Sequence, residues 1–228
     1  MLTVASYNIR KAVGTDRRRD PHRVIEVLHE IDADIVALQE ADRRFGARQA
    51  ALPLDILDDS PYTPVPFGIR PGGLGWHGNA ILVRRGIEVT GFHALHLPVL
   101  EPRGAVMAEL RIDGSPLRII GMHLDLSGLW RRRQVRSVLD HVRACAGAMP
   151  TILMGDLNEW SHSGGCLREF DGYRILGTGR SFHSRRPIAS LDRIIVGPGV
   201  DVADCGVHHS PKASLASDHL PIWAKIAL

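Results

Sequence analysis

Short apolar runs separated by short polar stretches recur along the whole chain, and this spacing constrains the fold more than any other feature. Runs of this length that are rich in bulky apolar side chains predict buried strands. The predicted strands are 2–8, 34–40, 79–85, 105–112, 116–124, 151–158, 190–197 and 219–228. Parallel pairing needs a long crossover connection, and several of these neighbours are joined by stretches too short to hold one. We therefore expect an α/β protein with largely antiparallel sheets and helices on their outer faces.

Only two stretches carry a strong helical pattern. The first begins at Asp20 and Pro21, a capping residue followed by a proline in the first turn. The second is expected over 128–146. Apolar residues recur on one face of each helix, formed by Val24, Leu28 and Ile31 in the first and by Val135, Val138, Leu139 and Val142 in the second.

Length and composition predict a single compact domain over 1–228. The chain has 228 residues, of which 44% are hydrophobic, and it contains no Ser/Gly linker and no repeat. No stretch reaches the length of a membrane span, the first residues lack the pattern of a signal peptide, and the three cysteines form no CxxC pair. We therefore expect a cytoplasmic protein with no integral membrane segment, and no obligate protein partner is evident.

Basic residues outnumber acidic ones by 28 to 25, and all but three of the basic residues are arginines. The runs Arg17–Arg19 and Arg131–Arg133 would attract a polyanion, or they are the solvated faces of a loop and a helix. Aromatic residues make up only 5% of the chain. This small number of aromatic side chains argues against a surface that binds single-stranded nucleic acid by stacking with its bases.

Acids, amides and histidines cluster at the ends of the predicted strands. They are Asn8, Glu40, His123, Asp156, Asn158, Asp192, Asp218 and His219. Each residue alone is typical of a turn, a helix cap or a satisfied polar position. Strands that end at one rim of a sheet bring such residues together, and ligands commonly bind at these rims. The repeated coincidence predicts one polar site at a rim.

A convergence of four carboxylates would require a cation. Two unit charges about 4 Å apart repel by roughly 4 kcal/mol at an effective dielectric constant near 20. Acids gathered in one pocket would therefore become protonated or destabilise the fold without a compensating charge. Carboxylate and amide oxygens favour Mg²⁺, with Mn²⁺ as a substitute, ahead of zinc. Carboxylates, a divalent cation and histidine together are suited to the hydrolysis of a phosphoester.

Six short motifs occur in a fixed order along the chain: "SYNIR", "LQE", "MHL", "GDLN", "LDRI" and "SDHLP". Together they resemble the endonuclease/exonuclease/phosphatase superfamily, whose fold is similar to that of deoxyribonuclease I. The resemblance implies a four-layer α/β/β/α sandwich of two mostly antiparallel sheets flanked by helices, with the site at one rim. It also implies that Glu40 is the principal metal ligand and that Asn8 and Asp218 contribute to the same Mg²⁺ site.

The same resemblance implies the catalytic roles. Asp156 would position or deprotonate the attacking water, and Asn158 would hold a phosphate oxygen. His219, oriented by Asp192, would contact the phosphate or serve as the base, so the identity of the base stays open. His123 would stabilise or protonate the leaving oxygen.

Three further positions resemble substrate-binding elements of small bacterial members. They are Asn79 in "GNAIL", Arg103 in "EPRG" and Arg131 in "RRRQ". Arg103 would clamp a phosphate bidentately, or it forms a structural salt bridge. Asn79 is equally typical of a turn beside Gly78, and a salt bridge or a helix-surface charge is the favoured interpretation of Arg131.

The leading hypothesis is a Mg²⁺-dependent phosphoesterase, preferably a phosphodiesterase, that acts on a phospholipid head group, a small phosphodiester or a nucleic acid. The alternatives are a DNA or RNA endonuclease or exonuclease, and a non-catalytic binding protein on the same fold. The residues "IR" after Asn8 and the sequence "LQEAD" depart from the pattern of abasic-site endonucleases. The segments 44–77 and 161–186 are expected to select the substrate.

Overall fold

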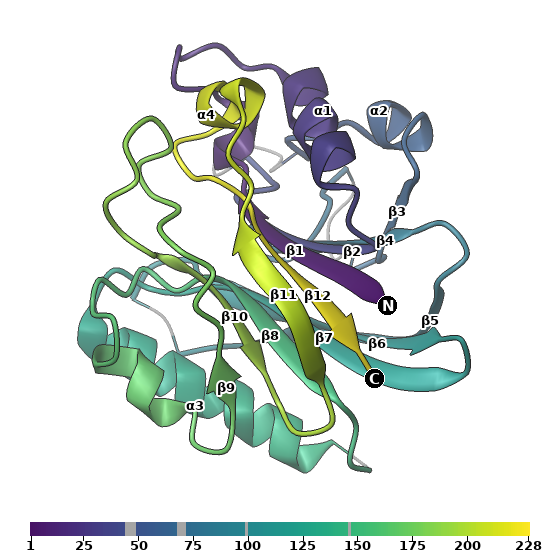
Figure 1. Cartoon of the computed structure of the whole chain (residues 1–228), viewed down its shortest axis with the longest axis vertical. Coiled ribbons are helices and arrows are strands. Elements are labelled where there is room, and N and C mark those ends of the chain that lie inside the picture. The colour runs from purple at the N-terminus through teal and green to yellow at the C-terminus, as the bar shows by residue number, and fades with distance from the viewer. Residues whose placement is uncertain (44–48, 68–71, 99, 146) are drawn as a thin grey trace.

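The computed structural model contains two six-stranded sheets packed face to face, with helices on both outer faces (Figure 1). The structure describes residues 1–43, 49–67, 72–98, 100–145 and 147–228. One apolar core lies between the sheets, and two further cores lie between each sheet and its helices. The expected four-layer α/β/β/α sandwich is confirmed.

The first sheet has the strand order β11-β12-β1-β2-β4-β3. Its strands are β1 (Leu2–Asn8), β2 (Ile35–Gln39), β3 (Tyr62–Pro64), β4 (Ala80–Arg84), β11 (Asp201–Val207) and β12 (Ile222–Ala227). The second sheet has the order β5-β6-β7-β8-β10-β9. Its strands are β5 (Glu88–Leu95), β6 (Gly104–Ile112), β7 (Ser115–His123), β8 (Thr151–Asp156), β9 (Arg174–Ile175) and β10 (Asp192–Val196).

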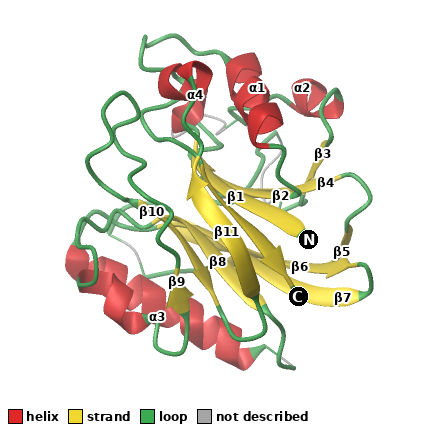
Figure 2. Cartoon of the chain, viewed as in Figure 1, coloured by secondary structure: helices red, strands yellow, loops and turns green. Residues whose placement is uncertain are grey.

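The helices divide between the two outer faces (Figure 2). The first sheet is covered by α1 (Pro21–Ile31), α2 (Leu54–Asp58) and α4 (Pro211–Ala216). The second is covered by α3 (Gly128–Ala144) and the 3₁₀ turn η2 (Gly165–Glu169). A second 3₁₀ turn, η1 (Arg10–Ala12), follows β1. No helix in the described part of the chain is long and apolar enough to cross a membrane.

Both strongly patterned helices are crossover connections. Among the described strands, the parallel pairs are β1–β2 and β7–β8, and α1 and α3 join them. All other pairings are antiparallel, as the short connections predicted. A parallel pair needs a long return path, and a helix packed on the sheet provides it.

The N-terminal end of α1 follows the predicted capping pattern, because the side chain of Asp20 accepts a hydrogen bond from Arg23 N at 3.2 Å. The second helix ends at Ala144, and the predicted last residue, Ala146, lies outside the described residues, as does part of the segment 44–77. The four edge strands of the two described sheets, β3, β5, β9 and β11, were not predicted. Strands β3 and β9 have only three and two residues, and β5 and β11 have many exposed residues, so their apolar alternation is weak.

Gly155 lies inside β8, with a φ of 156°. A Cβ atom at this position would lie 1.8 Å from the backbone oxygen of Met122 on β7. Glycine is therefore required for the close approach of these two strands.

Candidate active site

Polar residues on three strands of the second sheet form one row at its rim. The strand register pairs His123 of β7 with Asp156 of β8, and Asp156 with Asp192 of β10. In the first sheet, Asn8 ends β1, and its Nδ2 donates a hydrogen bond to Asp156 Oδ2 at 2.9 Å. The rims of the two sheets therefore meet at Asp156.

The Asp156 carboxylate is only 1% exposed and contacts several predicted site residues. Its Oδ2 lies 3.4 Å from His123 Nε2 and 3.7 Å from His219 Nε2. Its Oδ1 accepts a hydrogen bond from the backbone N of Asn158 at 2.9 Å. Asn158 lies beyond the end of β8, and its Nδ2 donates to Leu124 O at 2.9 Å. The amide thus reaches the rim through a turn and not along the face of the strand.

A buried carboxylate holds His219. The Nδ1 atom of the imidazole lies 2.8 Å from Asp192 Oδ2, and Ser181 Oγ donates to the same oxygen at 2.5 Å. Burial alone would lower the pKa of His219, but the charges of Asp192 and Asp156 outweigh burial and raise this pKa from 6.5 to about 10. With Nδ1 directed to Asp192, the Nε2 atom faces Asp156.

Two serines that the sequence analysis missed support this arrangement. Ser217 Oγ donates to Asn8 O at 2.7 Å and accepts a hydrogen bond from His219 N at 3.2 Å. Ser217 belongs to the "SDHLP" motif, so its position beside the histidine was a usable signal. Ser181 lies in a long loop, and no local pattern connects it with Asp192.

The predicted metal ligands Glu40 and Asp218 lie at the turn η1, which follows β1. The Lys11 ammonium forms an ion pair with Glu40, and Arg10 Nε lies 3.3 Å from Asp218 Oδ2. Both carboxylates are partly exposed. Each acid therefore contacts one of two consecutive residues, which places the two acids at the same part of the rim.

Left-handed backbone conformations accumulate around these acids. The residues Arg10, Lys11, Ala12, Glu40 and Asn158 have φ values of 47°, 56°, 58°, 53° and 50°. Side chains with a Cβ atom disfavour this region, and such residues persist where the surrounding structure enforces them, often at functional sites. The strain at this rim is consistent with a site that must present particular side chains.

One group of donors consists of Asp156, Asp192 and His219, whose ligand atoms lie within 4.8 Å of one another. These atoms already interact among themselves, and Asp192 Oδ2 has two hydrogen-bond donors. Within the described residues, Asp192 Oδ1 is buried without a hydrogen-bond partner. The hydrogen bonds of this group fit the orientation of an imidazole better than the ligation of an ion.

A second group consists of the predicted ligands Asn8, Glu40 and Asp218. It offers only oxygen atoms, and each carboxylate already attracts a cationic side chain. The Oδ1 atom of Asn8 accepts a hydrogen bond from Arg10 N at 3.1 Å, which directs this oxygen to the side of η1. Hard oxygen donors with excess negative charge fit a divalent cation such as Mg²⁺ or Mn²⁺.

Arg103 lies against the predicted leaving-group residue. Its Nη1 is 2.5 Å from His123 Nε2, and its Nη2 is 3.6 Å from Glu101 Oε2. Among the described residues, the buried Nε of Arg103 has no hydrogen-bond partner. The guanidinium thus lies beside the row formed by His123, Asp156 and Asp192, which is called the catalytic row below. Its contacts are compatible with both predicted roles, the phosphate clamp and the structural salt bridge.

Asn79 connects the two sheets. It is fully buried, and its Nδ2 donates to Gly104 O at 3.0 Å and to Trp76 O at 3.3 Å. The turn at Gly78 also contacts the loop after β2, because Ala41 N donates to Gly78 O at 2.8 Å. Asn79 Oδ1 is a buried acceptor with no partner in the described part of the chain.

Arg131 lies on α3 and is 8% exposed. Its Nη2 lies 3.3 Å from Glu159 Oε2, and its Nη1 donates to Leu126 O at 2.6 Å. These contacts match the salt bridge that the sequence analysis favoured. The predicted contact of Arg131 with substrate stays a prediction.

The Glu159→Gln variant is expected to be about 3 kcal/mol less stable than wild type at pH 7, because it leaves Arg131 as an uncompensated buried charge. Burial alone would raise the pKa of Glu159, but hydrogen bonds from the backbone of Ser161 and Cys166 and the charge of Arg131 lower it below 4.5. The stabilisation is therefore present above the unfolded-state pKa and is lost as the pH falls through the folded-state pKa. Urea unfolding at pH 7 and at about pH 3 measures this loss.

The control is Glu88→Gln, which removes an exposed glutamate paired with Arg111 and should change the free energy of unfolding little. An equal deficit of Glu159→Gln at both pH values would contradict the assignment.

The chain matches known proteins in family and in fold. The family model described as endonuclease/exonuclease/phosphatase matches residues 5–219. An endonuclease/exonuclease/phosphatase from Bacteroides vulgatus is 19% identical, with a TM-score of 0.78, and the match covers 100% of this chain and 98% of that chain. The mannosyl-6-phosphatase Bt3783 of Bacteroides thetaiotaomicron is 21% identical, with a TM-score of 0.76 and full coverage of both chains. D. rerio TDP2, solved with a single-strand DNA product, is 18% identical, with a TM-score of 0.74 and coverage of 100% and 99%. No curated protein sequence matches.

A four-layer sandwich with acids, amides and histidines at one rim is the architecture of a phosphoester hydrolase. The chain belongs to the endonuclease/exonuclease/phosphatase family. Members of this family hydrolyse phosphoester bonds and generally use divalent metal ions. The protein is accordingly an enzyme of this type. The motifs that suggested the family lie within the matched residues, except that the last motif, residues 217–221, extends two residues past the end of the match.

Proposed function

We propose that the protein is a Mg²⁺-dependent phosphodiesterase that hydrolyses a P–O bond by in-line attack of water. The observation that carries this proposal is the position of Asp156, with His219 Nε2 at 3.7 Å and His123 Nε2 at 3.4 Å from the same carboxylate oxygen. A proton acceptor and two proton carriers are thus gathered at one point of the rim, as phosphoester hydrolysis requires.

The site residues divide into a group that would bind the metal ion and a group that would transfer protons. Asn8, Glu40 and Asp218 would hold Mg²⁺, which when bound neutralises phosphate charge. Asp156 and His219 lie together where an attacking water needs a proton acceptor. The raised pKa of His219 keeps its imidazole protonated near neutral pH, so Asp156 would take that proton and His219 would contact the phosphate.

The remaining site residues bind and orient. Asp192 holds the imidazole of His219, so that its Nε2 faces the reacting group. Asn158 would donate to a phosphate oxygen, and Arg103 would do the same with two parallel hydrogen bonds. His123, which contacts both Arg103 and Asp156, would protonate the leaving oxygen.

Metal removal should abolish activity. EDTA is expected to stop hydrolysis of bis(p-nitrophenyl) phosphate, and Mg²⁺ or Mn²⁺ should restore it. The Glu40→Gln variant should bind Mn²⁺ at least about tenfold more weakly, a loss of about 1.4 kcal/mol, because a neutral amide replaces a ligand charge. Calorimetric titration with Mn²⁺ measures this loss independently of turnover.

The matched control for the metal experiment is Glu26→Gln, which removes an exposed glutamate that pairs with Lys212 on the helical face. It should retain wild-type activity and Mn²⁺ affinity. Full turnover in EDTA, or wild-type Mn²⁺ affinity in Glu40→Gln, would contradict the proposed metal site.

A nuclease is the second candidate, because the run Arg17–Arg19 is exposed and one structural neighbour was solved with a single-strand DNA product. Another neighbour is a mannosyl-6-phosphatase, so monoesters belong in the same test. A panel of diesters, monoesters, DNA and RNA separates these activities. A nuclease should also bind nucleic acid with an affinity that falls steeply with salt, and a flat salt dependence would favour a small diester. If none of these substrates is hydrolysed and the protein does not bind Mn²⁺, the result would favour a non-catalytic protein.

A further inference from the structure

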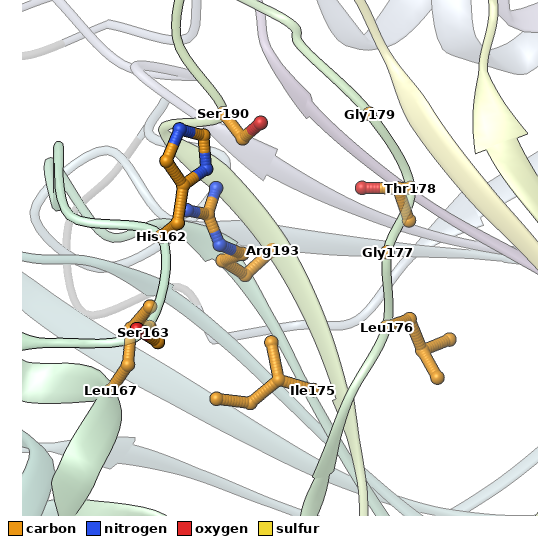
Figure 3. Close-up of a pocket in the computed structure, with 10 residues that line it drawn as sticks. All are labelled: His162, Ser163, Leu167, Ile175, Leu176, Gly177, Thr178, Gly179, Ser190 and Arg193. Carbon is orange, nitrogen blue, oxygen red and sulfur yellow. The ribbon is translucent and has the colours of Figure 1, made fainter.

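A cavity of about 370 Å³ lies beside β10, outside the catalytic row (Figure 3). Its walls combine polar and apolar side chains, including His162, Thr178, Ser190, Arg193, Ile175 and Leu176. The volume is within the range of small-molecule sites, and a few polar groups over an apolar wall are typical of such sites. Most of its lining residues belong to the segment 161–186, which the sequence analysis expected to select the substrate, and Ser190 and Arg193 complete the lining.

Arg193 supplies a buried positive charge at this cavity. It follows Asp192 in β10, so its side chain leaves the opposite face of the strand from the catalytic row. The residue is 4% exposed, and its Nη1 and Nη2 donate to the carbonyl oxygens of Asp192 and Ser161 at 3.2 and 3.5 Å. Within the described part of the chain, no carboxylate forms an ion pair with it. Burial lowers the pKa of Arg193, so nearby acids do not compensate its charge fully.

The nearby acid Glu159 is already engaged by other donors. Its oxygens accept hydrogen bonds from Ser161 N at 3.0 Å and Cys166 N at 3.1 Å, and they pair with Arg131 at 3.3 Å. Glu159 therefore neutralises a different arginine. A buried guanidinium without a carboxylate partner is costly unless an anion neutralises it.

We propose that this cavity binds a phosphate-type anion, either inorganic phosphate or the phosphate group of a small organic monoester. The planar guanidinium of Arg193 favours phosphate, because its fork of N–H donors matches two phosphate oxygens. In Figure 3 the Arg193 side chain extends toward His162, and the Thr178 hydroxyl points into the same space. Ile175 and Leu176 leave an apolar wall for an organic moiety. This binding is independent of the proposed catalytic function, because no residue of the catalytic row is needed for it.

The test is a ¹⁵N NMR titration of the full chain in EDTA with inorganic phosphate. The backbone amides of Gly177, Thr178 and Gly179 should shift saturably. Arg193→Gln should weaken this binding at least about tenfold, since hydrogen bonds to a charged group are lost. Thr178→Val keeps the side-chain shape and should weaken binding a few-fold. The matched control, Arg111→Gln, removes an exposed arginine elsewhere and should bind as wild type.

A second titration with glycerol phosphate separates the two ligand sources. Equal affinities would show that the cavity recognises the anion alone, and tighter binding of glycerol phosphate would show that the apolar wall contributes; both support the proposal. Should Arg193→Gln fail to fold, Thr178→Val and the exposed His162→Ala decide the question. The proposal is overturned if these amides do not move in millimolar phosphate, or if the cavity variants bind as wild type.

Discussion

The Asp156→Asn variant is expected to lose about 10⁴-fold in kcat while keeping its fold, because one carboxylate serves the whole catalytic row. Its oxygens contact the side chains of Asn8, His123 and His219. Asparagine keeps the shape but removes the charge and the proton-accepting oxygen. Steady-state hydrolysis of bis(p-nitrophenyl) phosphate at saturating Mg²⁺ measures the loss.

The control for this substitution is Asp140→Asn, which changes an exposed aspartate of α3 in the same way. It should have wild-type kcat, and both variants should show the circular dichroism spectrum of the folded protein. Wild-type turnover of Asp156→Asn would refute the proposed mechanism.

The second large effect is expected for the pair Asp192 and His219. Asp192→Asn and His219→Ala should each lower kcat by about 10²- to 10⁴-fold, and the double variant should lose little more than His219→Ala alone. The reason is that Asp192 acts through the imidazole, which it holds at 2.8 Å. A double-mutant cycle on kcat measures this coupling.

A purely structural role of Asp192 would give a different result. Its removal would then lower stability without changing the imidazole, whereas an orienting role predicts a changed ¹⁵N NMR signature of His219 in Asp192→Asn. Ser181→Ala is a milder companion variant, because it removes a donor to the same carboxylate oxygen and leaves the aspartate in place. If the losses in log kcat of the two single variants simply add in the double variant, the proposed coupling is refuted.

Most of the fold followed from local patterns. Strands such as β1 and β8 are buried at nearly every residue and carry several bulky apolar side chains, so they were recognisable without knowledge of their partners. The two helices with clear apolar faces proved to be the two crossovers. The edge strands β5 and β11, one in each sheet, escaped prediction because many of their residues are exposed.

The sequence predicted which residues lie at the candidate site better than it predicted which of them contact one another. Motif residues at strand ends are brought together by the register of β7, β8 and β10, as the position of strand ends suggested. The contact of Ser181 with Asp192, and those of Arg10 and Lys11 with the rim acids, were not foreseen. These contacts join segments that no local spacing connects.

The chain alone determined which residue types stand at the ends of its strands, and therefore which chemistry is available. Only the tertiary structure decided which of them interact, because strand order and sheet packing set the distances between distant segments. Arg131 and Arg193 illustrate the difference, because packing pairs the first arginine with a buried glutamate and places the second at a cavity. Hydrophobic periodicity is a local property, whereas the pairing of buried charges depends on every segment that packs around them.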